Sequence, residues 1–138
     1  MRMFRFVSMS NLKTYAFENL LCWQLARQLA VWTYKITISF PQEEKFGIIS
    51  QMRRAGVSIA ANLAEGTSRL TKKDQAHFSS ISYSSSMELL NHLIIANDLK
   101  FISEFSYQER REKIEKLTHM IASLRKSQQS NTKLTKTS

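Results

Sequence analysis

Residues 49–66 read ISQMRRAGVSIAANLAEG, and their apolar positions recur at the spacing of one helical face. Upstream, Pro41 is followed by Glu43 and Glu44, which are acids suited to the first turn of a helix. Gly66 is the natural residue to end that helix just after Glu65. The sequence therefore predicts a helix from shortly after Pro41 to Glu65, whose buried stripe consists of Ile49, Met52, Gly56, Ile59 and Leu63.

The preceding segment predicts a helix over residues 20–39. Asn19 is placed to act as its N-cap, and Phe40–Pro41 ends it. Steps of three and four residues define its core face. The expected core positions are Leu21, Leu25, Leu29, Trp32 and Ile36.

Two more helices are predicted downstream. Thr71 and Asp74 form a capping box for a third helix that extends to Leu99. Its expected stripe comprises Phe78, Ile81, Ser85, Leu89, His92, Ala96 and Leu99. Within it, residues 79–86 read SSISYSSS, interpreted as small residues that permit close helix approach; the alternative is a phosphorylation or hydroxyl-binding patch. Ser106 and Glu109 cap a fourth helix with a stripe of Ile114, Leu117, Ile121 and Leu124.

The composition agrees with a few long helices around one core. The 138 residues include only 3 Gly and 1 Pro, too few for the many turns of an all-β protein. We therefore predict an all-α fold, an antiparallel up-down-up-down four-helix bundle over residues 17–126. A flexible basic arm is expected over residues 1–16, and a disordered polar tail over residues 127–138.

The chain is expected to be cytoplasmic. No run of about 18 apolar residues predicts a membrane span, and the N-terminal apolar stretch is interrupted by Arg5. The single cysteine, Cys22, cannot form an intramolecular disulfide and is interpreted as a buried thiol in a reducing compartment.

The net charge of +9 is predicted to concentrate at one end of the bundle. In this topology the start of the first helix, the loop between the second and third helices, and the end of the fourth helix lie together. That end has ten basic and three acidic residues, whereas the opposite end has four basic and five acidic residues. Such a concentration favours a phosphate backbone. The expected ligand is a nucleic acid, with RNA favoured. The residues expected to bind it are Arg69, Lys72, Lys73, Arg125 and Lys126.

Polar residues of the second helix form a second candidate site. Arg53, Arg54, Asn62 and Glu65 lie among alanines, where buried polar groups need internal partners. Two interpretations stay open: a buried structural network, or a polar site that faces a ligand or another subunit.

Neither metal binding nor catalysis is expected. Glu88 with His92 and Glu115 with His119 are spaced i, i+4, but di-metal bundles use Glu-x-x-His and further glutamates from the other two helices. No Gly-rich phosphate loop, nucleophile elbow or Ser/His/Asp signature is present. We therefore expect no metal, no cofactor and no enzymatic activity.

Several motifs together resemble a known family. They are the segment 51–66, FENL at 17–20 before Trp23-Gln24, FPQEEKFG at 40–47, and Lys72-Lys73-Asp74 before Phe78. This combination resembles the bacterial four-helix-bundle proteins encoded in intervening sequences of 23S ribosomal RNA genes, the S23-type proteins. Asn19 and Ala60 depart from the pattern, which usually has Asp and Pro at these positions.

The resemblance implies a bundle that assembles as a ring-shaped homopentamer. A related branch, the accessory variability proteins of diversity-generating retroelements, partners a reverse transcriptase and binds RNA through a basic surface. The resulting hypothesis is a non-enzymatic, oligomeric RNA-binding accessory protein with a reverse transcriptase as candidate partner. The alternative is a homo-oligomeric protein-interaction scaffold without nucleic-acid binding, with contacts through Trp23, Tyr34, Tyr83 and Met87.

Overall fold

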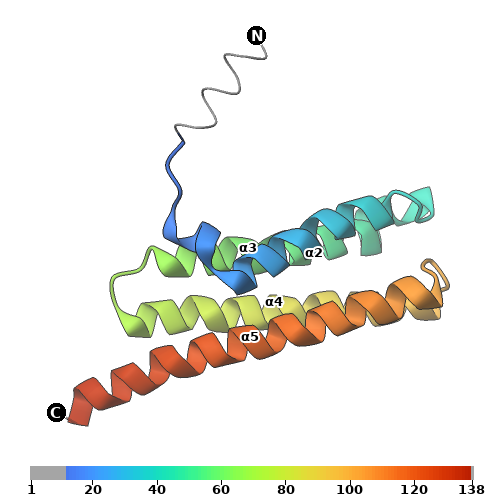
Figure 1. Ribbon diagram of the computed structural model, residues 1–138. Helices are drawn as coiled ribbons and strands as arrows, with labels where there is room; N and C mark the ends of the chain where they lie inside the picture. The colour runs from blue at the N-terminus through green and yellow to red at the C-terminus, as the bar shows by residue number, and fades with distance from the viewer. Residues whose placement is uncertain (1–11, 138) are drawn as a thin grey trace.

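The computed structural model describes residues 12–137, and their side chains as far as Gln129. A 3-10 turn at Ala16–Asn19 precedes α2 (Leu21–Thr37), and a second 3-10 turn (Gln42–Glu44) and a π-helical turn (Lys45–Ile49) lead into α3. The remaining helices are α3 (Ser50–Thr67), α4 (Lys72–Asp98) and α5 (Glu104–Thr137) (Figure 1). No strand occurs between residues 12 and 137, so the predicted all-α class is confirmed. Most of the predicted arm, residues 1–11, lies outside the described residues.

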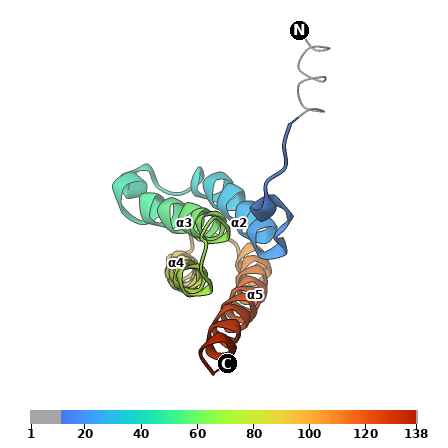
Figure 2. The same cartoon turned by 90° about the vertical axis from the view of Figure 1, so that its left-hand side faces the viewer.

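The four long helices form the predicted antiparallel bundle. α3 packs against α2 and α4, α4 packs against α5, and contacts between α2 and α5 close the bundle. The pair α2 and α3 lies over the pair α4 and α5 in both views (Figures 1 and 2). The start of α2, the α3–α4 loop and the C-terminal end of α5 lie at one end, as the topology predicted.

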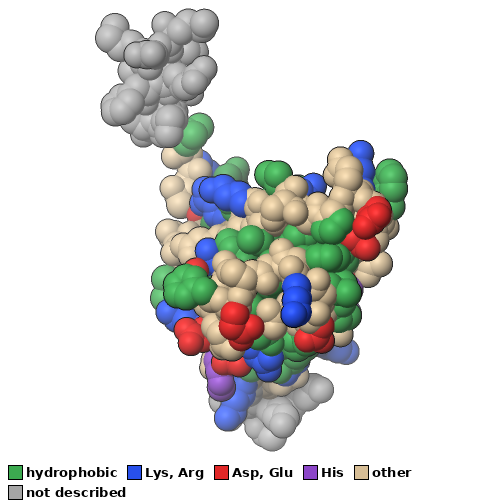
Figure 3. Space-filling view, turned by 90° about the vertical axis from the view of Figure 1, so that its right-hand side faces the viewer, with side chains coloured by type: hydrophobic (Ala, Val, Ile, Leu, Met, Phe, Trp, Pro, Cys, Tyr) green, Lys and Arg blue, Asp and Glu red, His purple; other side chains and the backbone are tan. Residues whose placement is uncertain are grey.

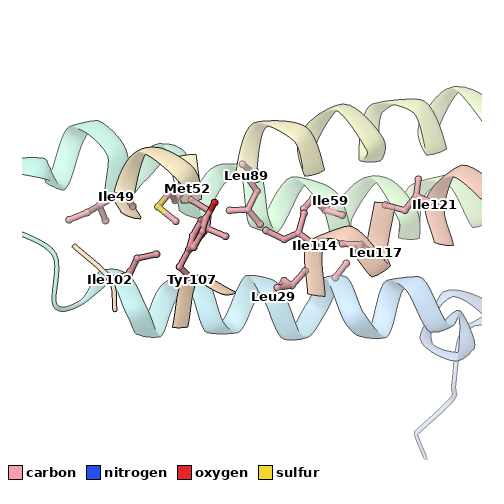
Figure 4. Packing of buried hydrophobic residues seen from close by; sticks show 14 of the residues in the cluster. Leu29, Ile49, Met52, Ile59, Leu89, Ile102, Tyr107, Ile114, Leu117 and Ile121 are labelled. Carbon is pink, nitrogen blue, oxygen red and sulfur yellow. The ribbon is translucent and has the colours of Figure 1, made fainter. Parts of the chain in front are cut away.

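The core is built from the predicted stripes of α3 and α5. Ile49, Met52, Gly56, Ile59 and Leu63 are all buried, and so are Ile114, Leu117 and Ile121. Figure 4 shows part of this core between the helices, and its labelled side chains include Leu29, Ile49, Met52, Ile59, Leu89, Ile114, Leu117 and Ile121. Within residues 12–137, no helix has the length and the apolar character that crossing a bilayer requires.

The predicted core face of α2 is wrong by about one residue of rotation. Leu21 is 67% exposed, whereas Thr33 and Thr37 are buried. The threonines tolerate burial because their hydroxyls donate to backbone carbonyls one turn earlier, of Leu29 and Thr33, each at 2.7 Å. The buried face therefore consists of Cys22, Ala26, Leu29, Thr33 and Thr37.

Small residues allow α3 and α4 to approach closely, as the serine run predicted. The Ser82 hydroxyl donates across the interface to the carbonyl oxygen of Ile59 at 3.0 Å. The hydroxyls of Ser58 and Ser85 lie 2.9 Å apart. The buried serines of α4 are Ser79, Ser82, Ser85 and Ser86.

The helix starts agree with the sequence at one of three predicted N-caps. The Thr71 hydroxyl accepts from the Asp74 amide at 3.1 Å, which confirms the N-cap of α4. The N-cap of α2 is Leu20 and not Asn19, because Asn19 closes the preceding 3-10 turn. In α5 the hydroxyl of Ser103, and not that of Ser106, accepts from a first-turn amide at 3.1 Å.

Gly66 does not end α3 in a left-handed conformation, since α3 continues to Thr67. The glycine serves helix packing instead: a Cβ at this position would lie 3.2 Å from the Cβ of Phe78 on α4. The start of α3 is also later than predicted, because Gly47 adopts a non-helical conformation in the π-helical turn. α3 runs unbroken through Ala60.

The predicted disordered tail after residue 126 is wrong in its first residues. α5 continues to Thr137, and Gln128 is only 7% exposed. Its Oε1 atom accepts a 2.8 Å hydrogen bond from the Ser79 hydroxyl on α4. Composition did not reveal this partner, because Gln128 lies in a polar segment without apolar periodicity.

We predict that Gln128→Ala destabilises the fold by about 1–3 kcal/mol, because it leaves the buried Ser79 hydroxyl without its acceptor. The matched control is Gln129→Ala, which alters the exposed neighbour. Urea denaturation followed by circular dichroism measures both. Equal stability of the two variants would contradict the position of α5.

We also predict that Cys22 resists thiol reagents in the native protein. The residue is 3% exposed, and burial raises the pKa of its thiol, so that little thiolate is accessible. Absorbance with Ellman's reagent should rise quickly only after denaturant is added. The control is Ser39→Cys in a Cys22→Ala background, which places a thiol on the surface and should react at once.

Candidate nucleic-acid interface

The predicted nucleic-acid residues lie on two sides of α4. Arg69 from the α3–α4 loop stacks 4.6 Å from the ring centre of Phe78, and its Nη2 lies 2.9 Å from Glu65 Oε1. On the other side, Arg125 of α5 stacks 4.9 Å from the ring centre of Tyr83. Both guanidinium groups are thus held against aromatic rings. They therefore lose less conformational entropy when they bind a ligand.

The cations are spread along α4 and do not form one compact cluster. The Ser79–Gln128 and Tyr83–Arg125 contacts set the antiparallel register of α4 and α5. Lys72 lies seven residues before Ser79, roughly 10 Å further along the axis. Lys72, Lys73 and Lys126 are exposed. Four of the ten basic residues counted at this end lie outside the described side chains: Arg2, Arg5, Lys133 and Lys136.

Between the two stacked arginines runs an exposed stripe of α4. Its members follow at helical spacing: Lys73, His77 and Ser84 are exposed, and Ser80 is half-buried. Asp74, the acid nearest to Lys73 in sequence, lies about 100° around the helix from it. We call the combined surface the α4 track; its residues are Arg69, Lys73, His77, Ser80, Ser84 and Arg125.

The α4 track offers the donors that a sugar–phosphate backbone needs. Within the described part of the chain, the hydroxyls of Ser80 and Ser84 have no hydrogen-bond partner, so they are available to a ligand. Cationic and hydroxyl side chains account for most contacts to phosphate and sugar in nucleic-acid complexes. The sequence offered the serine run only as an alternative hydroxyl-binding patch, because spacing alone does not tell which of its serines face solvent, and it did not identify His77.

The opposite end of the bundle has a different character. Acidic and basic side chains are interspersed there among apolar ones (Figure 3). Exposed Glu43 and Glu104 share this end with Lys45 and Lys100. This end lacks the concentration of positive charge that the sequence assigns to the other.

The two arginines of the second candidate site make separate contacts. Arg53 donates through Nε to Thr37 Oγ1 at 2.9 Å and through Nη2 to the Tyr34 carbonyl at 3.3 Å. Its guanidinium also stacks 4.7 Å from the Tyr34 ring centre. Arg54 pairs instead with Glu88 of α4 at 3.0 Å. Arg53 thus ties α3 to α2, and Arg54 ties α3 to α4.

The other two polar residues of α3 bond locally. Asn62 donates to the carbonyl of Ser58 at 2.9 Å, and Glu65 pairs with Arg69. Arg53, Arg54, Asn62 and Glu65 therefore do not share one network. Their contacts are structural and lie partly at the surface.

In both Glu–His pairs the glutamate also pairs with an arginine. Glu88 Oε1, which binds Arg54, lies 3.7 Å from His92 Nε2, and Glu115 pairs with Arg111 at 3.5 Å. In the described chain, no three His, Cys, Asp or Glu side chains are grouped as metal ligands.

An apolar groove runs along the outer side of α2 and α3, with a volume of about 280 Å³. Val31 and Val57 on its walls are 49% and 45% exposed. Exposed aliphatic residues beside alanines are typical of surfaces that another helix covers. We call it the α2/α3 groove; Trp23, Arg27, Ala30, Val31, Val57, Ala60, Ala61 and Ala64 line it.

Comparisons with known proteins agree with this fold. No curated protein matches the chain. Among solved structures, the chain is similar to a protein of unknown function from the S23 ribosomal protein family of Bacteroides thetaiotaomicron. The two share 19% identity and a TM-score of 0.69, over 76% of this chain and 98% of the other. The model of the family described as 23S rRNA-intervening sequence protein matches residues 18–123. The chain therefore belongs to the 23S rRNA-intervening sequence protein family.

Proposed function

We propose that this protein is a non-enzymatic, oligomeric RNA-binding accessory protein whose RNA-binding surface is the α4 track. The observation that carries the proposal is the exposed stripe of lysine, histidine and unpaired hydroxyls between two ring-stacked arginines. The resemblance favours RNA over DNA, because the related accessory variability proteins bind RNA through a basic surface. The exposed Lys72 and Lys126 lie outside the track and extend the positive field around it.

The dimensions of the α4 track suit a short stretch of one strand. From Lys73 to Ser84 the helix advances about 16 Å, at 1.5 Å per residue. A strand of duplex DNA advances about 3.4 Å per nucleotide, so on that scale the track faces roughly five nucleotides. Contacts of this kind recognise the backbone and carry no base sequence directly.

Self-association is the second part of the proposal. The α2/α3 groove supports it, because its exposed valines and alanines would be covered by a second copy. The family resemblance favours a ring of five copies. A ring would repeat the α4 track, so that weak contacts add through avidity. A reverse transcriptase is the proposed protein partner, and the cytoplasm the proposed location.

A protein-interaction scaffold without RNA binding is the second candidate function. The α2/α3 groove favours this function, because an apolar surface suits a protein partner and does not attract a polyanion. RNA binding and self-association therefore need separate tests.

We predict that Lys73→Glu and Ser84→Glu each weaken binding to a structured RNA roughly tenfold at moderate salt, because each introduces a negative charge on the α4 track. Fluorescence anisotropy between 50 and 200 mM salt, a range over which phosphate contacts weaken strongly, measures the affinities. The control Lys45→Glu introduces the same charge at the opposite end and should have a small effect. A salt-independent affinity, or equal losses in all three variants, would refute binding by the track.

We predict that Ala61→Glu dissociates the oligomer, because it places a charge in the apolar α2/α3 groove. Light scattering after size exclusion should give the wild type a multiple of the 16.0 kDa chain mass and the variant a lower one. Gln51→Glu, at an exposed site of α3 outside the groove, should keep the wild-type mass. A monomeric wild type would rule out self-association while leaving the RNA measurement valid.

A further inference from the structure

A second groove lies on the other side of α2, facing α5, with a volume of about 320 Å³. Three of its six lining residues are cations, and they come from two helices. None of the six is acidic. We call it the α2/α5 groove; it is lined by Arg27, Gln28, Val31, Trp32, Lys35 and Arg110.

Arg110 is held in this groove by stacking. Its guanidinium lies 4.8 Å from the ring centre of Trp32, and its side chain is 25% exposed. Its Nε atom is buried and makes no hydrogen bond in the described chain. Among the described residues, Arg110 forms an ion pair only with its neighbour Glu109, at 3.5 Å, and Glu109 does not line the groove. The guanidinium is therefore fixed in place with spare donors.

The other two cations are even less neutralised. Arg27 lies 5.5 Å from the ring centre of Trp23, and no carboxylate pairs with it among the described residues. Lys35 is exposed and has no acidic partner in that part of the chain. No acid occurs anywhere in α2. Like charges around one cavity repel each other, and a bound anion removes this repulsion.

We propose that the α2/α5 groove binds a nucleotide, with its base on the Arg110–Trp32 stack and its phosphate at Lys35, about one helical turn after Trp32. A guanidinium plane held against an aromatic ring is a stacking platform for a base on its other face. Arg110 both stacks on Trp32 and lines the groove, so its exposed part faces the cavity. The nucleotide is either a free mononucleotide or an unpaired nucleotide of RNA.

This site is separate from the α4 track. α2 and α4 lie at diagonal corners of the bundle (Figure 2), and no residue of the α4 track lines the α2/α5 groove. The proposal therefore does not depend on RNA binding by the track. Arg27 and Val31 line both grooves of α2, so a copy packed in the α2/α3 groove would border the nucleotide site.

Tryptophan fluorescence tests the site directly. The chain has 2 Trp, so Trp23→Phe leaves Trp32 as the single reporter. Titration with AMP should quench Trp32 and reach saturation, because a base stacks near the indole. In this background, Arg110→Gln and Lys35→Gln should each raise the Kd for AMP at least about fivefold. Lys116→Gln removes an exposed charge of α5 outside the groove and should leave the Kd unchanged.

Parallel titrations with inorganic phosphate and a ten-nucleotide unpaired RNA identify the source of the nucleotide. Saturation by AMP supports a free nucleotide, and saturation by the RNA alone supports an unpaired nucleotide of RNA. Phosphate as tight as AMP, no saturation with either nucleotide, or an unchanged Kd in Lys35→Gln would overturn the proposal. Lys73→Glu separates the two sites: it should weaken structured-RNA binding and leave the quenching by AMP intact.

Discussion

The hydrogen bond from the Ser82 hydroxyl to the Ile59 carbonyl joins α3 and α4 in the middle of the core. It requires the two helices to lie close together, which only small side chains at their interface allow. Gly66 meets the same requirement further along, where a Cβ would press on Phe78. This close contact fixes the rotation and register of α4, and α5 is then placed by the bond between Ser79 and Gln128.

The rotation of α4 determines what the bundle shows to solvent. Because Ser79, Ser82, Ser85 and Ser86 face inward, Ser80 and Ser84 face outward in line with Lys73 and His77. One serine-rich segment thus serves two purposes: its buried hydroxyls join helices, and its exposed hydroxyls lie on a surface suited to phosphate. The stacking of Arg69 on Phe78 and of Arg125 on Tyr83 adds cations at both edges.

α2 presents the complementary case. Its charged residues, Arg27 and Lys35, are all basic, and it separates an apolar groove toward α3 from a cationic groove toward α5. The burial of Thr33 and Thr37 turns Arg27 and Val31 toward solvent as the ridge between these grooves. This simple bundle thereby has three chemically distinct surfaces: the α4 track, the α2/α3 groove and the α2/α5 groove.

The sequence by itself determined the helices, their antiparallel order, the buried stripes of α3 and α5 and the Thr71 cap, because these follow from spacing and local hydrogen bonding. Only the tertiary structure decided which face of α2 is buried, that position 66 requires a glycine for the close packing of α3 and α4, and that Gln128 in the polar part of α5 is buried. It also showed that the cations spread along α4 and line a groove beside Trp32. The physical reason is that a polar or small side chain takes its role from the helix opposite it. The Thr33 hydroxyl donates to a carbonyl of its own helix, whereas Gln128 bonds to Ser79 of another helix. The periodicity of the sequence does not indicate that partner.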